Sequence, residues 1–248
     1  MSESEQSELL TVVVCCLNEE ENVRETVESV YDEAPDIALD LDVLLVDDGS
    51  TDDTRQVMQQ LCREHETCRM LAHDENRGLG ASLLRAYDHV PDGAWVTCLP
   101  GDNEFYFESI HEFLELRDEY DFILGYPANP VVRPFKRRVA SRAFLEVAKA
   151  LFGLNYAYLN GMHMYRIEAV RGLELEASGH AYVPELLSKA ILRDRQLEVG
   201  ECPFHLRGRD AGASNAFQPA AVLEAVWETG RAFRAVSEFR EACLEDEA

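Results

Sequence analysis

The segment VLLVDDGSTD at residues 43–52 is the part of this chain that is most informative about its fold. The first four residues are all apolar, which is typical of a strand buried on both faces of a parallel sheet. Two carboxylates and a glycine turn follow directly, so acidic groups lie at the carboxyl end of the strand. In open α/β sheets, ligands bind in the crevice beyond these strand ends. A turn or a helix cap uses the same residue types, so the segment alone leaves a structural role open.

Strand-length apolar runs alternate with segments of helical period through the first half of the chain. This alternation indicates βαβ units. The pattern predicts strands near 10–16, 42–47, 68–72, 94–99 and 121–125, and helices near 19–34, 53–65, 78–90 and 107–119. We therefore expect an α/β fold with a Rossmann-like, doubly wound, mostly parallel sheet and helices on both faces.

The pattern changes after Gly125, where a proline-rich loop leads into a basic segment. The second half predicts helices near 135–152 and 181–193 and strand-like stretches at 156–166 and 196–202. Residues 217–243 have the spacing of one amphipathic helix. We expect one domain over residues 1–215, and a C-terminal helix within 216–248 that packs on this domain or on a partner.

Composition restricts the function of the chain. Its 248 residues include 47 acidic and 23 basic side chains, a formal charge of −24. A chain this acidic repels polyanions, so we expect no nucleic-acid partner. Concentrated salt would screen its self-repulsion, which favours a halophilic source. Seven cysteines without a Cys-x-x-Cys pair suggest free thiols. The sequence encodes neither a spanning segment nor a secretory leader, so we expect a cytoplasmic protein.

Polar loops follow each of the first four predicted strands. Because the carboxyl ends of parallel strands meet at one edge of the sheet, these loops should converge there. Any single loop could be a helix cap, but polar loops at all four strand ends favour a binding site. They are LNEEEN at 17–22, DDGS at 47–50, NRGLG at 76–80 and PGDNEF at 100–105.

The series NEEEN, VDDGSTDDT, NRGLGASL and LPGDNEF resembles the family 2 glycosyltransferases of the GT-A fold. The resemblance covers about residues 10–215. It is greatest to the branch of dolichyl-phosphate mannose synthase and the polyprenyl-phosphate glycosyltransferases. That branch is indicated by Arg137-Arg138 with Ser141, by Asn160-Gly161, by Glu185-Leu186-Leu187, and by the segment RGRDAGAS at 207–214.

The resemblance implies a site for a nucleotide-sugar donor. Asn18, Glu19 and Asp47 would contact the base and ribose, and carboxylates suit this role because they accept hydrogen bonds from such groups. Asp48 would hold the loop or the ribose. The predicted donor site comprises Leu17, Asn18, Glu19, Asp47, Asp48, Arg77, Gly78, Gly101 and Asp102.

The resemblance also implies a divalent metal. Asp102 would be the remaining acid of the Asp-x-Asp motif that binds a cation bridging the two phosphates of the nucleotide. Pro100 stands where the first aspartate is expected, and Glu104 occupies a position often held by Gln. Oxygen ligands from Asp102 and Glu104 suit Mg²⁺ or Mn²⁺. We therefore expect both acids to act in catalysis through this metal.

A basic cluster indicates the acceptor. Five basic residues fall within positions 133–142 of an acidic chain, which suggests a bound anion. Arg137 and Ser141 lie one helical turn apart and could hold one phosphate together. Arg133 precedes the helix, and Arg207 or Arg209 could approach from a later loop. A polyprenyl or dolichyl phosphate at the membrane surface fits this site, whereas a solvated helix face or a contact with an anionic membrane remains an alternative.

The acceptor determines the mechanism. A phosphate oxygen is already anionic, so it could attack the anomeric carbon in line and invert its configuration without a strong base. Transfer to a glycan or small-molecule hydroxyl would need a carboxylate base, for which Glu185 is the candidate. A homologue that binds nucleotide sugar without turnover is the third reading, because of Pro100. A homodimer, a membrane-protein partner and a peripheral place at the cytoplasmic face of the membrane are further expectations.

Overall fold

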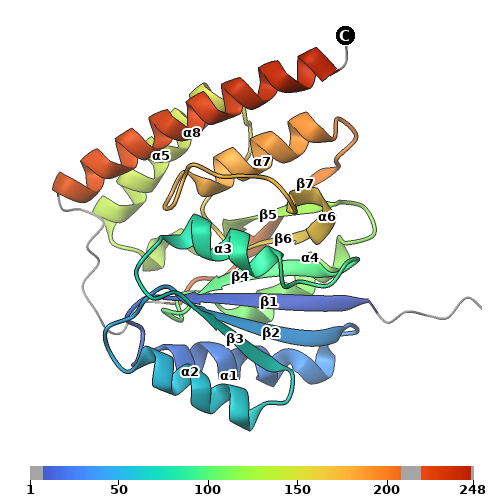
Figure 1. Ribbon diagram of the computed structural model, residues 1–248, viewed down its shortest axis with the longest axis vertical. Helices are drawn as coiled ribbons and strands as arrows, with labels where there is room; N and C mark the ends of the chain where they lie inside the picture. Colours follow the sequence, from blue (N-terminus) through green and yellow to red (C-terminus); the bar gives the residue numbers. More distant parts are fainter. Residues whose placement is uncertain (1–7, 208–218, 247–248) are drawn as a thin grey trace, which may run out of the picture.

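The computed structural model describes residues 8–207 and 219–246, and within them the chain forms a seven-stranded mixed sheet between two layers of helices (Figure 1). The strand order is β3-β2-β1-β4-β6-β5-β7. The strands are β1 (Leu9–Cys16), β2 (Asp40–Asp47), β3 (Cys68–Ala72), β4 (Trp95–Pro100), β5 (Phe122–Pro127), β6 (His163–Arg166) and β7 (Val199–Phe204). The expected α/β architecture is confirmed.

The helices divide between the two faces of the sheet. One core joins the sheet to α1, α2 and α4, and the other joins it to α3, α5, α6, α7 and α8. Their bounds are α1 (Val23–Glu33), α2 (Thr54–Glu64), α3 (Leu79–Tyr87), α4 (Ile110–Glu115), α5 (Phe135–Phe152), α6 (Ile167–Val170), α7 (Tyr182–Arg193) and α8 (Pro219–Asp246). Short 3-10 turns are η1 (Ala34–Asp36), η2 (Phe107–Ser109) and η3 (Pro130–Val132).

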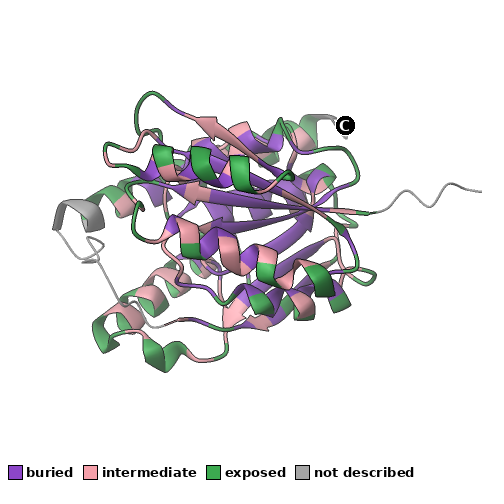
Figure 2. Cartoon of the chain, turned by 90° about the horizontal axis from the view of Figure 1, so that it is seen from below, coloured by how far each residue is buried: buried purple, intermediate pink, exposed green. Residues whose placement is uncertain are grey.

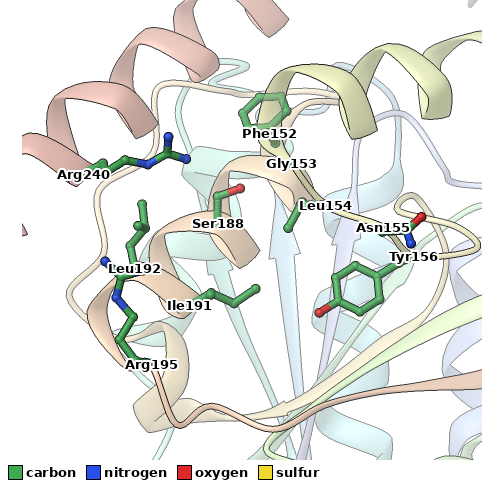
Figure 3. A pocket seen from close by; sticks show the side chains of 10 residues that line it. All are labelled: Phe152, Gly153, Leu154, Asn155, Tyr156, Ser188, Ile191, Leu192, Arg195 and Arg240. Atoms are coloured by element: carbon green, nitrogen blue, oxygen red, sulfur yellow. The ribbon is translucent and has the colours of Figure 1, made fainter.

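Strand β1 shows why the central strands are continuous runs of apolar residues in the sequence. Val12 and Val14 pack into the core of one face and Val13 into the core of the other, because successive side chains of a strand point to opposite faces. All three are fully buried. Figure 2 shows the same burial in the central strands, whereas the edge strand β3 is mostly half-buried.

Strand β6 is the one antiparallel member of the sheet within the described residues, and it pairs with both β4 and β5. The sequence predicted a longer strand-like stretch at 156–166, but only His163–Arg166 pairs. Residues before it make a close turn instead: a Cβ added to Gly161 would lie 2.6 Å from the carbonyl oxygen of Gly125. The predicted helix at 107–119 is likewise shorter, because it divides into η2 and α4.

Helix α8 lies along α7 and α5 on one side of the molecule (Figure 1). Its packed side includes Ala232 and Val236, which are buried. The ring of Phe233 meets that of Phe152 edge-on, with centroids 6.2 Å apart. In the part of the chain that the structure describes, no helix is both long and apolar enough to cross a bilayer.

Candidate active site

The structure brings the four polar loops to one edge of the sheet. Cys16, the last residue of β1, is level with Asp47, the last residue of β2, and Asp47 is level with Ala72 in β3. On the other side of β1, Cys15 is level with Pro100 at the end of β4. The loops that follow these four residues are therefore neighbours.

The side chain of Asp47, which the sequence predicts to contact the nucleotide, points inward in the structure. The side chain is fully buried. Its Oδ1 accepts a hydrogen bond from the Ser50 backbone N–H at 2.9 Å, and its Oδ2 accepts one from Arg55 Nε at 2.6 Å. A buried carboxylate needs such partners, because its desolvation would otherwise be costly. Asp47 therefore fixes the turn that follows β2.

Asp48 joins two of the loops. Its Oδ1 accepts a hydrogen bond from the backbone N–H of Arg77 at 2.8 Å, and its Oδ2 accepts one from Gly78 at 2.9 Å. Gly78 has a φ of +85°, a conformation that residues with a Cβ rarely adopt. The carboxylate thus holds the loop after β3 against the loop after β2, which is the loop-holding role weighed for it.

Leu17, Asn18 and Glu19 form the loop after β1. Asn18 has a φ of 56°, and strained backbone of this kind is concentrated at functional sites. Its backbone N–H donates to Ser50 Oγ at 3.0 Å, and its Oδ1 accepts from the Thr51 N–H at 2.8 Å. Leu17 and Asn18 are exposed and Glu19 is half-buried. This loop, rather than Asp47, presents open surface at the sheet edge.

The loop after β4 is packed tightly beneath Asp102. A Cβ on Gly101 would lie 2.5 Å from the Cys16 sulfur, so only glycine fits there. Asn103 follows with a φ of 54°, and its buried Oδ1 has no hydrogen-bond partner. Asp102 Oδ1 accepts a hydrogen bond from the Glu104 backbone N–H at 3.1 Å. Asp102 and Asn103 are thus adjacent oxygen-bearing side chains of this loop, where the sequence predicts Asp102 and Glu104 as metal ligands.

Glu104, which the sequence predicts as a metal ligand together with Asp102, is paired with two arginines in the structure. Its Oε2 accepts hydrogen bonds from Arg137 Nη2 at 2.8 Å and Arg133 Nη2 at 3.0 Å, and its Oε1 accepts one from Arg137 Nη1. The side chain is buried. Burial alone would raise the pKa of this carboxyl, but the two guanidinium groups hold it below its ordinary value.

Tyr158 completes the basic cluster, and sequence reasoning missed it. Its hydroxyl accepts a hydrogen bond from Arg133 Nη1 at 2.9 Å and one from Ser141 Oγ at 3.2 Å. The signal in the sequence that could have identified it is its place just before Asn160-Gly161. We call the set Arg133, Arg137, Ser141 and Tyr158 the arginine cradle.

Arg207 approaches the same region. Its backbone N–H donates to the Glu104 carbonyl oxygen at 2.7 Å, and its guanidinium lies 4.6 Å from the centroid of the Tyr106 ring. Its Nη1 is also 3.5 Å from Glu25 Oε1. Arg209, the other residue expected here, lies outside the described residues.

Glu185, the candidate general base for a hydroxyl acceptor, is held by neighbouring groups in the structure. The side chain is fully buried. Its oxygens accept hydrogen bonds from the backbone N–H groups of Glu176 and Ala177, and Oε1 lies 2.6 Å from Lys189 Nζ. Glu185 therefore anchors the segment before α7, and an acceptor hydroxyl has no access to it.

The fold and the site together define a class of protein. A mostly parallel sheet with helices on both faces and polar loops at its carboxyl edge is the arrangement of a GT-A fold glycosyltransferase. Residues 11–173 match the model of "Glycosyl transferase family 2", and the chain belongs to this family.

Curated relatives include lipid-phosphate sugar transferases by name. The chain is 25% identical over 221 residues to the dolichol-phosphate mannosyltransferase of Saccharomyces cerevisiae, covering 82% of this chain and 79% of that one. It is 26% identical over 213 residues to the dodecaprenyl-phosphate galacturonate synthase of Rhizobium johnstonii, covering 84% of this chain and 62% of that one. The family resemblance seen in the sequence is thus confirmed.

Solved structures show the same fold at low sequence identity. The glucosyl-3-phosphoglycerate synthase of Mycobacterium tuberculosis in complex with uridine diphosphate has a TM-score of 0.67 and 17% identity, covering 94% of this chain and 80% of that chain. A complex of that protein with Mn²⁺ and uridine-diphosphate-glucose has a TM-score of 0.67 and 18% identity, with 91% of this chain and 79% of that chain covered.

Proposed function

We propose that this protein transfers a sugar from a nucleoside-diphosphate sugar to a polyprenyl phosphate, with inversion at the anomeric carbon. One observation carries this proposal: the arginine cradle holds the carboxylate of Glu104. A carboxylate and a phosphate bind guanidinium groups with the same paired geometry. The cradle is therefore built for an oxyanion, and an acceptor phosphate would replace Glu104 on Arg133 and Arg137.

The chemistry of a phosphate acceptor agrees with the groups at this site. An anionic phosphate oxygen attacks the anomeric carbon, a bond forms between them, and the bond from that carbon to the diphosphate oxygen breaks. The electron pair leaves with the diphosphate, and no proton has to move. Arg133 and Arg137 would orient the acceptor, while Ser141 and Tyr158 would donate hydrogen bonds to its oxygens. This route needs no general base, which is consistent with the burial of Glu185.

The donor would lie over the loops at the carboxyl edge of β1, β2, β3 and β4. Leu17 and Asn18 are exposed there, and Arg77 and Gly78 are held in place by Asp48. We propose that Leu17, Asn18 and Glu19 contact the nucleoside, while Asp47 and Asp48 shape the floor beneath it. The names of the two curated relatives support a lipid-phosphate acceptor. They do not identify the base or the sugar of the donor.

The residues at the end of β4 fit a divalent cation. The buried, unpartnered Oδ1 of Asn103 follows directly on Asp102, and both supply the oxygen donors that Mg²⁺ and Mn²⁺ prefer. When bound, the cation would neutralise the developing charge of the departing diphosphate. We propose Asp102 and Asn103 as its protein ligands, in place of the pair Asp102 and Glu104 expected from the sequence.

The test incubates the purified protein with labelled UDP- or GDP-sugars, Mn²⁺ and a short-chain prenyl phosphate. We expect a lipid-linked sugar product, and we expect Asp102→Asn to lower its rate by roughly two orders of magnitude or more because charge neutralisation is lost. Asp118→Asn is the matched control, since this exposed acid lies outside the four loops, in the turn between α4 and β5.

Other outcomes separate the alternatives. Product formed only on hydroxyl acceptors would overturn the assignment of the cradle. Tight binding of a nucleotide sugar without turnover on any acceptor would instead identify a binding protein, consistent with Pro100 in place of the first aspartate.

A further inference from the structure

The first half of α5 and the turn before it expose large apolar side chains. Val131 and Val132 in η3 are 73% and 41% exposed, and Phe135 and Val139 in α5 are 71% and 52% exposed. The two buried residues of α5, Ala148 and Phe152, both lie in its last turns. The apolar side chains at the start of α5 are therefore not covered by the described part of the domain.

Helix α8 adds a second set of exposed apolar side chains. Leu223, Val226 and Trp227 are 59%, 64% and 69% exposed. At 100° per residue they lie on the side of the helix opposite Ala232 and Val236, which pack on the domain. Helix α8 therefore has an apolar side that the described part of the domain does not cover.

Both sets lie at the edge of the sheet that carries the candidate site. Helix α5 starts there, because Arg137 in its first turn reaches Glu104 in the loop after β4. Helix α8 passes there too, because Glu228 accepts a hydrogen bond from the Gly179 N–H and the neighbouring Ser178 contacts Gly78. Figure 1 shows the two helices on the same side of the sheet. We call the exposed residues Val131, Val132, Phe135, Val139, Leu223, Val226 and Trp227 the α5–α8 face.

The α5 part of this face has a charge opposite to that of the molecule, whereas α8 carries more acidic than basic residues. Helix α5 carries five basic residues and one acidic residue in a chain whose formal charge is −24. Lys136 and Arg142 are exposed, and no acidic side chain among the described residues lies within ion-pair distance of either. Arg138 lies over the ring of the exposed Phe135, 5.6 Å from its centroid. Apolar and aromatic side chains bordered by unpaired cations are typical of a surface that binds anionic lipids.

We propose that the α5–α8 face docks on a lipid bilayer that contains anionic headgroups. The inference rests on the proposed function, and it names the surface through which the protein reaches its acceptor. The apolar side chains enter the interfacial region, while Lys136 and Arg142 contact the headgroups. The acidic remainder of the protein is repelled by the same membrane, so the edge with the arginine cradle faces the lipid. A second copy of this chain fits less well, because two chains of −24 repel each other.

Vesicle cosedimentation tests this proposal with phosphatidylcholine alone and with roughly one third phosphatidylglycerol added. We expect binding to the mixed vesicles that weakens as salt is raised. The double variant Phe135→Ser/Val139→Ser should lower the partition coefficient about tenfold or more, since apolar burial is lost. Lys136→Glu/Arg142→Glu should abolish the preference for the anionic lipid. Leu244→Ser is the matched control, because Leu244 is also exposed, at 53%, but lies in the last turn of α8.

The outcomes are distinct. Wild-type partitioning of Phe135→Ser/Val139→Ser, with an unchanged melting temperature, would overturn the proposal. A dimer in sedimentation equilibrium that this variant dissociates, without vesicle binding by either protein, would assign the face to self-association. Transfer to a water-soluble short-chain prenyl phosphate separates a failure of the docking proposal from a failure of the proposed function. If that transfer is retained without vesicle binding, only the docking fails; if vesicle binding is retained without any transfer, only the proposed function fails.

Discussion

The observed partners of Glu104 differ most from those that its place in the sequence predicts. Sequence position placed it beside Asp102 as a second oxygen ligand, but the two arginines reach it from a segment that begins about thirty residues later. No spacing rule connects these positions, because the contact depends on how η3 and α5 return to the loop after β4. Its neighbour Asn103 was passed over for the same reason: only the fold shows that its oxygen is buried without a partner.

Replacing Glu104 with Gln should tighten the binding of inorganic phosphate, the simplest stand-in for the acceptor. The carboxylate that competes for Arg133 and Arg137 is removed, so we expect a dissociation constant about tenfold lower in calorimetric titration. Without phosphate the variant should unfold at a lower temperature, because two partly buried guanidinium groups lose their counter-ion, and phosphate should restore part of the loss.

Glu108→Gln is the control for this prediction, since Glu108 is exposed in the following turn. Equal phosphate affinity in the wild type and in Glu104→Gln would show that the anion binds elsewhere.

Among the elements, β6 carries a residue, His163, that makes the stability of the protein depend on pH. The imidazole is buried, with Nε2 3.2 Å from the Tyr182 hydroxyl and no partner for Nδ1. Desolvation by burial lowers the pKa of His163 from 6.5 to about 4. The neutral ring belongs to the core, which assigns it to packing rather than to catalysis.

Stability should therefore fall with acidity between about pH 6.5 and pH 4. In this range the unfolded chain binds a proton at His163 and the folded protein does not, so the free energy of unfolding rises with pH. The contribution lost between about pH 7 and pH 5 is roughly 2 kcal/mol. Urea unfolding of the wild type and of His163→Gln at both pH values measures it. A difference between the two proteins that does not change with pH would contradict the assigned cause.

The first half of the fold was predictable element by element, and the second half was not. Strands β1 to β4 alternate with helices, and β1, β2 and β4 are largely buried on both faces, so period and apolarity specify them. β6 is short and antiparallel and follows a turn set by the contact of Gly161 with Gly125, which is a feature of tertiary packing. The same division holds at the site, where the four loops were predicted and the inward direction of Asp47 was not.

The charge of the whole molecule leads to a prediction about salt. A formal charge of −24 on 248 residues makes the compact state repel itself, and mobile ions screen this repulsion. We expect the melting temperature to rise as sodium chloride increases from about 10 to 150 mM, the range in which the screening length changes most. Differential scanning calorimetry measures the rise, and sucrose of equal osmolality is the control. A melting temperature that is flat over this range would mean that the acidic residues are not destabilising.

The strand order also has a consequence for synthesis on the ribosome. Strands β1 to β4 pair with one another, so that part of the sheet can form as soon as about one hundred residues have emerged. β5 has neither of its neighbours at that stage, because β6 and β7 both come later in the chain. A nascent chain that stops before His163 would expose both edges of β5, and unpaired edges are where intermediates aggregate. The side of the molecule that holds the four polar loops is thus completed first during translation, and the side that holds the arginine cradle is completed last.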